Sequence, residues 1–327
     1  MKNKERHDLT KSAMIEEIPL ACSDELAAVE LLEALRWGKN PTCAHCGSAN
    51  VYKMMDSGAA IGEVVKRNKR YLWRCHDCKK QYTVRIGTVY EESRLDLRHW
   101  CYAFWRASTS KKGVAALEIM RHCQISYKSA LFMLNRIRFA MAPDNPEAAK
   151  LTGTVECDET YVGGKPRYRH TSKSGRGTKK TPVFAAVERH GRIRRQIIPN
   201  VSGKTLKGAI REMVDKQARI VTDELRSYRG LGKEFAGGHH TVAHLTREYV
   251  RGDIHTNTAE SSFALLKRGI TGIYHSVSKE YLHRYLWQFD FLWNARRMND
   301  GERTIMAIKL ADGKRLMYKQ PTADSRL

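Results

Sequence analysis

Two CxxC pairs constrain the fold of this chain more than any other feature of its 327 residues. Cys43 and Cys46 form the first pair, Cys75 and Cys78 form the second, and 28 residues separate the two pairs. Four thiolates in two tight knuckles suit one tetrahedral zinc ion, which the two turns approach from opposite sides. We therefore expect a zinc ribbon over residues 41–93, with a structural zinc ion; disulfide or chance pairing is the alternative.

The N-terminal residues and the cysteine content indicate the cellular compartment of the protein. Its first residues lack the apolar stretch of a signal peptide, and eight cysteines without export indicate reduced thiols. No segment approaches the roughly 18 apolar residues that span a bilayer. We therefore expect a cytoplasmic, nucleoid-associated protein without membrane contact. Four thiols have no partner at ligand spacing and are expected to be buried: Cys22, Cys101, Cys123 and Cys157.

The charge of the chain favours a nucleic-acid partner. There are 58 Lys and Arg residues against 35 Asp and Glu, which gives a net charge of +23. Each phosphate that such a surface neutralises releases condensed counterions, which favours binding to double-stranded DNA over a merely soluble basic protein. Basic residues near the second knuckle favour DNA contact by the ribbon: Lys66, Arg67, Lys69, Arg70, Arg74, Lys79 and Lys80.

Between the ribbon and the second half of the chain, the pattern predicts a helix-turn-helix over residues 94–145. Residues 113–123 have the apolar spacing of a first helix, and Ser126 can cap a second. A recognition helix enters the major groove by its first residues, so the base-contact candidates are Tyr127, Lys128 and Ser129. Polar residues further along the same helix could also reach DNA: Asn135, Arg136 and Arg138. An ordinary helical hairpin fits the pattern nearly as well.

The second half of the chain reads as an α/β domain over residues 151–300, after a linker with two prolines. Strands are expected at 153–162, 182–189, 192–201, 218–223 and 241–245, and helices at 204–217, 258–268 and 279–297. In this order the first three strands form a meander and a crossover places the fourth beside the first, as in an RNase H-like mixed sheet. Residues 1–40 are expected to form a polar arm to residue 20 and a helix capped by Ser23, and residues 301–327 a tail.

Three acids stand where a two-metal nuclease would need them. Asp158 and Asp223 interrupt apolar runs, where burying a lone carboxylate is costly without a partner. The predicted strand order places them on adjacent strands, and Glu260 could reach them from a covering helix. Because Mg²⁺ and Mn²⁺ prefer carboxylate oxygens, the three acids predict a catalytic site for these cations.

Local alternatives remain for each of these acids. Glu156 and Glu159 flank Asp158, and Glu224 follows Asp223, so strand phase decides which carboxylates point inward. Asn257 and Glu260 fit a helix capping box, with Asn257 as the N-cap and Glu260 at the third helical position. Lys267 lies two turns beyond Glu260 on the same face, where a cation suits a phosphate backbone. His255 could orient a ligand or merely precede the cap.

A basic loop follows the first strand of this domain. Residues 164–180 contain seven Lys or Arg residues and no acid. Such a run is commonly just solvated, but its position after Asp158 equally allows it to clamp DNA. The candidates for that contact are Lys165, Arg167 and Arg169.

The stretches TVECDETYVGGK, VTDELRSYRGL and HTNTAESSFALLKRG resemble the catalytic domain of bacterial insertion-sequence transposases of the DDE type. The group with an N-terminal zinc ribbon is the most similar, and the resemblance covers about residues 25–317. It implies that Asp158, Asp223 and Glu260 are the catalytic acids. The group's third position is either Asn or Glu, and both Asn257 and Glu260 are present here; we favour Glu260, because a carboxylate binds a hard cation more strongly than an amide.

The resemblance also implies an activity and partners. Such an enzyme binds the terminal repeats of its element, as a homo-oligomer on DNA, and cleaves and joins strands with two Mg²⁺ ions. Asp158 would bridge the ions, one activating water and the other stabilising the leaving 3′ oxygen. Two alternatives are a zinc-ribbon transcription regulator, which leaves the acids unexplained, and another RNase H-like nuclease such as a resolvase, which leaves the DNA-reading segments unexplained.

Overall fold

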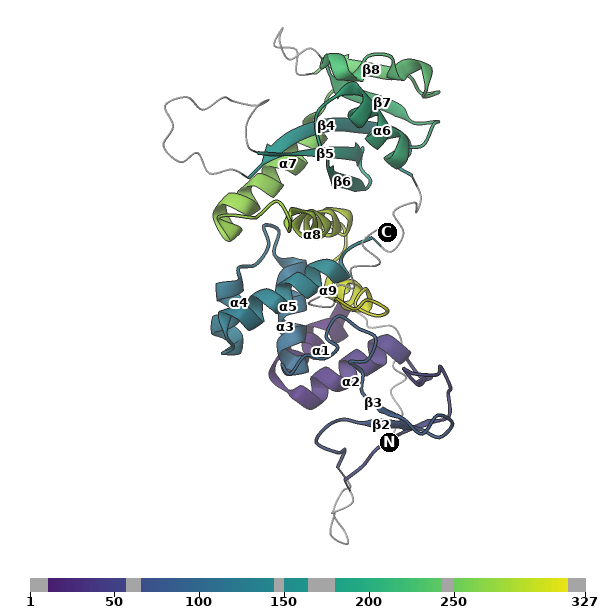
Figure 1. The fold of residues 1–327 in the computed structure, drawn as a ribbon, viewed down its shortest axis with the longest axis vertical. Coiled ribbons are helices and arrows are strands. Elements are labelled where there is room, and N and C mark those ends of the chain that lie inside the picture. Colours follow the sequence, from purple (N-terminus) through teal and green to yellow (C-terminus); the bar gives the residue numbers. More distant parts are fainter. Residues whose placement is uncertain (1–10, 57–65, 144–149, 164–179, 243–249, 317–327) are drawn as a thin grey trace. The chain divides into compact units, whose positions relative to one another are not determined.

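The structure of the chain is a computed structural model that describes residues 11–56, 66–143, 150–163, 180–242 and 250–316 (Figure 1). These residues divide into two compact units. The first unit comprises the described parts of residues 1–109, 116–141 and 298–327, and the second those of residues 110–115 and 142–297. No described helix is long and apolar enough to cross a membrane.

A small antiparallel sheet in the first unit carries the two cysteine knuckles. Its strands, in the order β1-β2-β3, are β1 (Val51–Lys53), β2 (Trp73–Cys75) and β3 (Gln81–Tyr82). Trp37 packs edge-on against both Trp73 and Tyr82, with ring centroids 5.5 and 5.9 Å apart. This aromatic cluster gives the small sheet a core beside its cysteines, so the predicted ribbon is confirmed as a three-stranded unit.

The rest of the first unit is helical. Its helices are α1 (Lys11–Ser23), α2 (Glu25–Trp37), α3 (Leu97–Thr109), α4 (Ala116–Cys123), α5 (Tyr127–Ala140) and α9 (Asp300–Lys309). The expectation of a polar arm through residue 20 is wrong, because α1 begins at Lys11. The N-cap of α2 is Asp24 rather than Ser23, and its carboxylate accepts the Ala27 N–H at 2.7 Å.

The described part of residues 301–327 is not a separate tail, because α9 packs against α1 and α3. Thr304 and Ser108 of α3 share a hydrogen bond between their hydroxyls at 3.0 Å. The guanidinium of the buried Arg303 donates to the Ser108 carbonyl at 3.4 Å. The helix α9 therefore contributes to the core of the first unit.

The second unit is built on a mixed five-stranded sheet in the order β6-β5-β4-β7-β8. Its strands are β4 (Thr154–Val162), β5 (Thr181–Glu188), β6 (Ile193–Ile197), β7 (Arg219–Asp223) and β8 (His239–Val242). The first three strands pair antiparallel, whereas β7 is parallel to β4 and β8 is parallel to β7. The predicted meander, with the fourth strand beside the first, is confirmed.

Helices cover both faces of this sheet (Figure 1). On one face, Val155 and Cys157 of β4 pack with α6 (Gly203–Met213). On the other face, residues of β5 pack with α7 (Asn257–Gly269) and α8 (Leu282–Asn294). Two single turns, η1 (Arg226–Tyr228) and η2 (Leu231–Lys233), connect β7 to β8, and a π-helical turn, η4 (Ile270–Tyr274), follows α7. The face covered by α7 is the one that receives the predicted acids.

Candidate active site and metal centre

The sheet register brings Asp158 and Asp223 to the same face. Val155 pairs with Ile220 in the parallel β4–β7 ladder, and both side chains pack toward α6. Because side chains alternate along a strand, Asp158 and Asp223 point to the opposite face, which α7 covers. Continuing the register by two residues from the Glu156–Val221 pair sets Asp158 beside Asp223. The strand phase, which the sequence left open, thus puts Asp158 and Glu156 on the face opposite Val155 and Cys157.

The pKa of Asp158 reflects its burial and the neighbouring acids. Burial is the largest cause, and together with the charges of Glu159, Asp223 and Glu260 it raises the pKa of Asp158 to about 8. The Glu159 N–H donates to the Asp158 carboxylate at 2.8 Å, which opposes the rise. Asp158 is therefore a half-buried carboxyl group whose charge is disfavoured by burial and by like charge nearby, and a bound cation would offset both effects.

The three acids do not converge as tightly as the cysteines do. In the described part of the chain, only the four knuckle cysteines bring three or more potential ligand atoms within 4.8 Å of one another. Three carboxylates at one site repel each other, and a bound cation would offset that repulsion. The donor set of Asp158, Asp223 and Glu260 fits a hard divalent cation such as Mg²⁺, which prefers oxygen ligands.

The start of α7 differs from the predicted capping box. The N-cap is Thr256, whose side chain makes no cap hydrogen bond, and Asn257 is the first helical residue. The free N–H groups of Thr258 and Ala259 donate instead to the carboxylate of Glu156, at 2.8 and 3.1 Å. The capping-box interpretation is therefore wrong, because the N–H groups at the start of α7 are accepted by the Glu156 carboxylate on β4 and not by the side chain of Asn257.

This arrangement leaves the candidate side chains of α7 exposed. Asn257, Glu260 and Lys267 are all accessible to solvent. His255, just before the helix, places Nδ1 3.3 Å from the Glu156 carboxylate. Both candidates for the third ligand, Asn257 and Glu260, therefore lie on α7 together with Lys267.

Both glutamates that flank Asp158 have partners of their own. Glu156 is fully buried and accepts a hydrogen bond from the Arg189 guanidinium at 3.0 Å. Glu159 points to the opposite face, where it accepts the hydroxyl of the buried Tyr228 at 2.6 Å. Sequence reasoning treated Glu156 and Glu159 only as competitors of Asp158. Their partners lie far away in the chain, so no local pattern could reveal these contacts.

The four knuckle cysteines form the second candidate metal centre. The Sγ atoms of Cys43 and Cys78 lie 3.6 Å apart and those of Cys46 and Cys75 lie 3.7 Å apart, with all four within 4.8 Å of one another. Each knuckle is closed by a backbone hydrogen bond, from Gly47 to Cys43 and from Cys75 to Lys80. Four sulfur donors at this spacing fit one tetrahedral zinc ion.

The predicted base-contact residues lie at the start of α5, where Ser126 caps the helix by accepting the Ser129 N–H at 3.1 Å. Tyr127 and Lys128 are exposed, and Ser129 is half-buried. The expectation that Arg136 reaches DNA is wrong, because its buried guanidinium donates to the carbonyls of Val89 and Glu91, both at 2.6 Å.

Two further arginines that were expected to contact DNA also serve the fold. Arg138 is 1% exposed and donates to the Asn135 side chain at 3.3 Å. Arg67, beside the ribbon, donates to the buried Glu33 at 2.9 Å. A basic residue in a helix or hairpin pattern gives no indication of its exposure, so the sequence could not separate these arginines from their exposed neighbours. Three predicted contacts lie outside the described residues: Lys165, Arg167 and Arg169.

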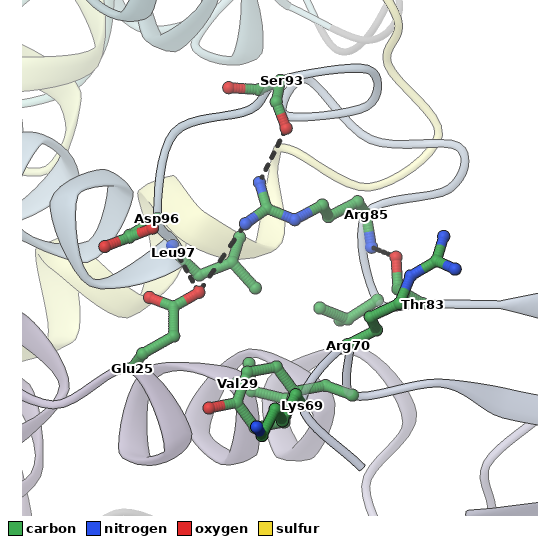
Figure 2. A pocket seen from close by; sticks show the side chains of 11 residues that line it. Glu25, Val29, Lys69, Arg70, Thr83, Arg85, Ser93, Asp96 and Leu97 are labelled. Carbon is green, nitrogen blue, oxygen red and sulfur yellow. Dashed lines mark hydrogen bonds and ion pairs between the residues drawn. The ribbon is translucent and has the colours of Figure 1, made fainter. Parts of the chain in front are cut away.

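A cleft of about 490 Å³ lies within the first unit, between the ribbon and the helices α2 and α3. Figure 2 shows Glu25 among the lining residues, joined by a dashed line to Arg85; the two charged groups are 3.6 Å apart. The Glu25 carboxylate also accepts the N–H groups of Leu97 and Arg98, each at 2.9 Å. Glu25 thus connects α2 to the first turn of α3, and the cleft adds no group to the candidate active site.

Comparisons with known proteins agree with this arrangement. A family model described as an ISXO2-like transposase domain matches residues 150–294, which cover the five-stranded sheet and its helices. A second model, described as a transposase zinc-ribbon domain, matches residues 23–81. The chain is also 30% identical over 282 residues to a protein in transposable element ISH50 of Halobacterium salinarum; the match covers 81% of this chain and 89% of that protein.

Proposed function

This chain belongs to the family of transposases that carry an ISXO2-like transposase domain behind a transposase zinc ribbon, and we propose that it cleaves and joins DNA at the ends of its own element. The observation that carries this proposal is the placement of Asp158, Asp223 and Glu260 on one side of the mixed sheet, with the charges of the latter two raising the pKa of Asp158. The strand order supports an RNase H-like fold for this unit.

In this proposal Asp158 and Asp223 hold divalent cations from the sheet, and Glu260 completes the site from α7. Bound Mg²⁺ or Mn²⁺ would supply an activated water and stabilise the charge on a leaving 3′ oxygen. Glu260 is our choice over Asn257 as the third ligand, because a carboxylate offsets cation charge and a neutral amide does not. Lys267, exposed on the same helix, would contact a DNA phosphate.

The first unit would supply recognition of double-stranded DNA. We propose that α4 and α5 form a helix-turn-helix, in which the exposed Tyr127 and Lys128 begin the recognition helix. The ribbon, with its exposed Lys69 and Arg70, would add phosphate contacts. Homo-oligomerisation on DNA would bring two element ends together.

The test is to incubate the purified protein with labelled terminal DNA of its own element, with and without Mg²⁺. Site-specific nicks that leave 3′-OH ends, followed by joining to a target plasmid, would support the proposal. A transcription regulator would bind the same DNA without cutting it. A resolvase-like nuclease would prefer branched junctions to the linear ends, so a junction substrate serves as the comparison.

A further inference from the structure

Glu156 makes contacts that go beyond an ordinary buried ion pair. We propose that Glu156 is a positioning residue, whose carboxylate fixes the first turn of α7 to β4 and thereby sets where Glu260 stands relative to Asp158. This inference rests on the proposed function, because Glu260 has to be a site residue for its position to matter. Glu156 itself would touch neither DNA nor metal.

The contacts of the Glu156 carboxylate account for both of its oxygens. Oε2 accepts the backbone N–H groups of Thr258 at 2.8 Å and Ala259 at 3.1 Å. Oε1 accepts the Thr258 hydroxyl at 2.9 Å and Arg189 Nε at 3.0 Å. The side chain is 0% exposed, so none of these bonds is exchanged readily for water. A buried carboxylate thus receives three hydrogen bonds from two consecutive residues of α7.

The first N–H groups of a helix have no partner within the helix, and a negative charge near them is stabilising. A local side chain at the N-cap commonly satisfies one of these groups, and such a bond does not connect the helix to another element. Here the Thr256 side chain makes no such bond, and the acceptor belongs to the sheet. The start of α7 is consequently fixed to β4, two residues from Asp158 on the same strand face.

Arg189 extends this connection to the segment before α7. Its guanidinium donates to the carbonyls of Asp253 at 2.6 Å and His255 at 3.2 Å, in addition to Glu156. The positive charge also compensates the buried carboxylate, which would otherwise be costly to bury. Both the entry to α7 and its first turn are therefore held by one ion pair, between Glu156 on β4 and Arg189 directly after β5.

A purely structural role is the competing explanation, and Glu188 provides a matched control. It lies on β5 opposite Val155, on the other face of the sheet, and it too accepts backbone N–H groups. Its carboxylate binds the Thr152 N–H and Arg192 N–H, both at 3.2 Å. Glu188 therefore resembles Glu156 in accepting backbone N–H groups, but it is half-buried on the other face of the sheet, and these N–H groups lie outside α7.

The experiment compares Glu156→Gln with Glu188→Gln in the full chain. Groups that orient metal ligands typically contribute a factor of about 10–100 in metal affinity. We expect Glu156→Gln to raise the Mg²⁺ concentration for half-maximal cleavage by about that factor, with end binding retained. Glu188→Gln should leave the Mg²⁺ midpoint unchanged. Hydrogen exchange without DNA or metal should show faster exchange at the amides of Thr258 and Ala259 in Glu156→Gln alone.

Equal Mg²⁺ midpoints and equal amide exchange in the two variants would overturn the proposal. If Glu156→Gln does not fold, Thr258→Val removes the hydroxyl bond to Glu156 and keeps the backbone bond. This variant should shift the Mg²⁺ midpoint in the same direction by a smaller factor, and an unchanged midpoint would likewise overturn the proposal. Failure of the proposed function has a different signature: Asp158→Asn would still cleave.

Discussion

At the scale of single residues, the protonation state of Asp158 is the most informative property of the candidate site. A carboxyl group whose pKa rises on folding favours the folded state while it is protonated. For Asp158 this contribution is fully present below pH 3.8 and is lost as the pH rises through about 8, the value that burial and neighbouring carboxylates impose. Without metal, the raised pKa of Asp158 therefore lowers the stability of the folded state at neutral pH relative to acidic pH.

We accordingly expect metal-free Asp158→Asn to gain stability relative to the wild type as the pH rises from 4 to 8. Asparagine cannot ionise, so the penalty of the buried charge disappears in the variant. The measurement is the difference in melting temperature between the two proteins across this pH range in EDTA-treated samples. A difference that does not change with pH would show that Asp158 has an ordinary pKa.

A second residue-scale prediction separates Glu260 from Asn257. Because Glu156 rather than Glu260 caps α7, Glu260→Gln should leave the melting temperature nearly unchanged and reduce Mg²⁺-dependent cleavage by orders of magnitude. Asn257→Ser should keep much of the activity. Both variants need melting curves and cleavage rates on the same terminal DNA. Near-normal cleavage by Glu260→Gln, together with a folded but inactive Asn257→Ser, would give the ligand role to Asn257.

The sequence could predict which residues of β4 and β7 share a face, since alternation and the strand order are enough for that. It could not predict the partners of Glu156, because Arg189 and Thr258 meet it only after the sheet has formed and α7 has packed. The apparent capping box of Asn257 and Glu260 is a local pattern that this tertiary contact overrides. Arg136 shows the same limit, since its two acceptors lie on a distant loop.

At the scale of elements, the ribbon depends on its metal, because its three strands are only two or three residues long. Zinc contributes roughly 10–16 kcal/mol to the folding of small zinc-finger peptides. We expect one zinc ion per chain by elemental analysis, and its loss in Cys43→Ser or Cys75→Ser. Cys101→Ser, at a buried thiol outside the cluster, is the control. Zinc-free wild-type protein, freshly purified without chelator, would contradict this expectation.

The helix α5 carries both an exposed basic residue, Lys128, and a buried one, Arg136, and we expect their removal to have different effects. Lys128→Ala should weaken binding to terminal DNA with little change in melting temperature, because the side chain is exposed at the start of the helix. Arg136→Ala should lower the melting temperature, since it leaves the carbonyls of Val89 and Glu91 without their donor. Gel-shift titrations and melting curves of both variants provide the test. Unchanged DNA affinity in Lys128→Ala would remove α5 from the proposed interface.

Element boundaries show where local pattern stops being sufficient. The Ser126 cap and the start of α5 were predictable, because a serine cap is a local interaction. The start of α1 was missed, since its residues show no strong apolar periodicity to set them apart from a polar arm. The cysteine spacing predicted the ribbon but not its three strands: β1 is only three residues long and depends on its pairing with β2.

At the scale of the whole molecule, the two units are not simply consecutive segments of the chain, because the first unit is built from three separate segments. The change from helical to strand pattern near residue 150 correctly predicts the start of the mixed sheet. The return of α9 to the first unit was not predictable, because Thr304 and Arg303 find their partners at Ser108 far back in the chain. The predicted boundary at residue 300 lies close to the end of the second unit at Arg297. The helix α9, which begins there, belongs to the first unit and not to a separate tail.

The central claim is that Asp158 and Asp223 hold catalytic cations while other parts of the chain bind DNA. The most direct test measures end binding and strand cleavage side by side for the wild type, Asp158→Asn and Asp223→Asn in Mg²⁺. We predict that both variants bind terminal DNA as tightly as the wild type and give no detectable nicking or joining. Cleavage at the wild-type rate by both folded variants would contradict the account.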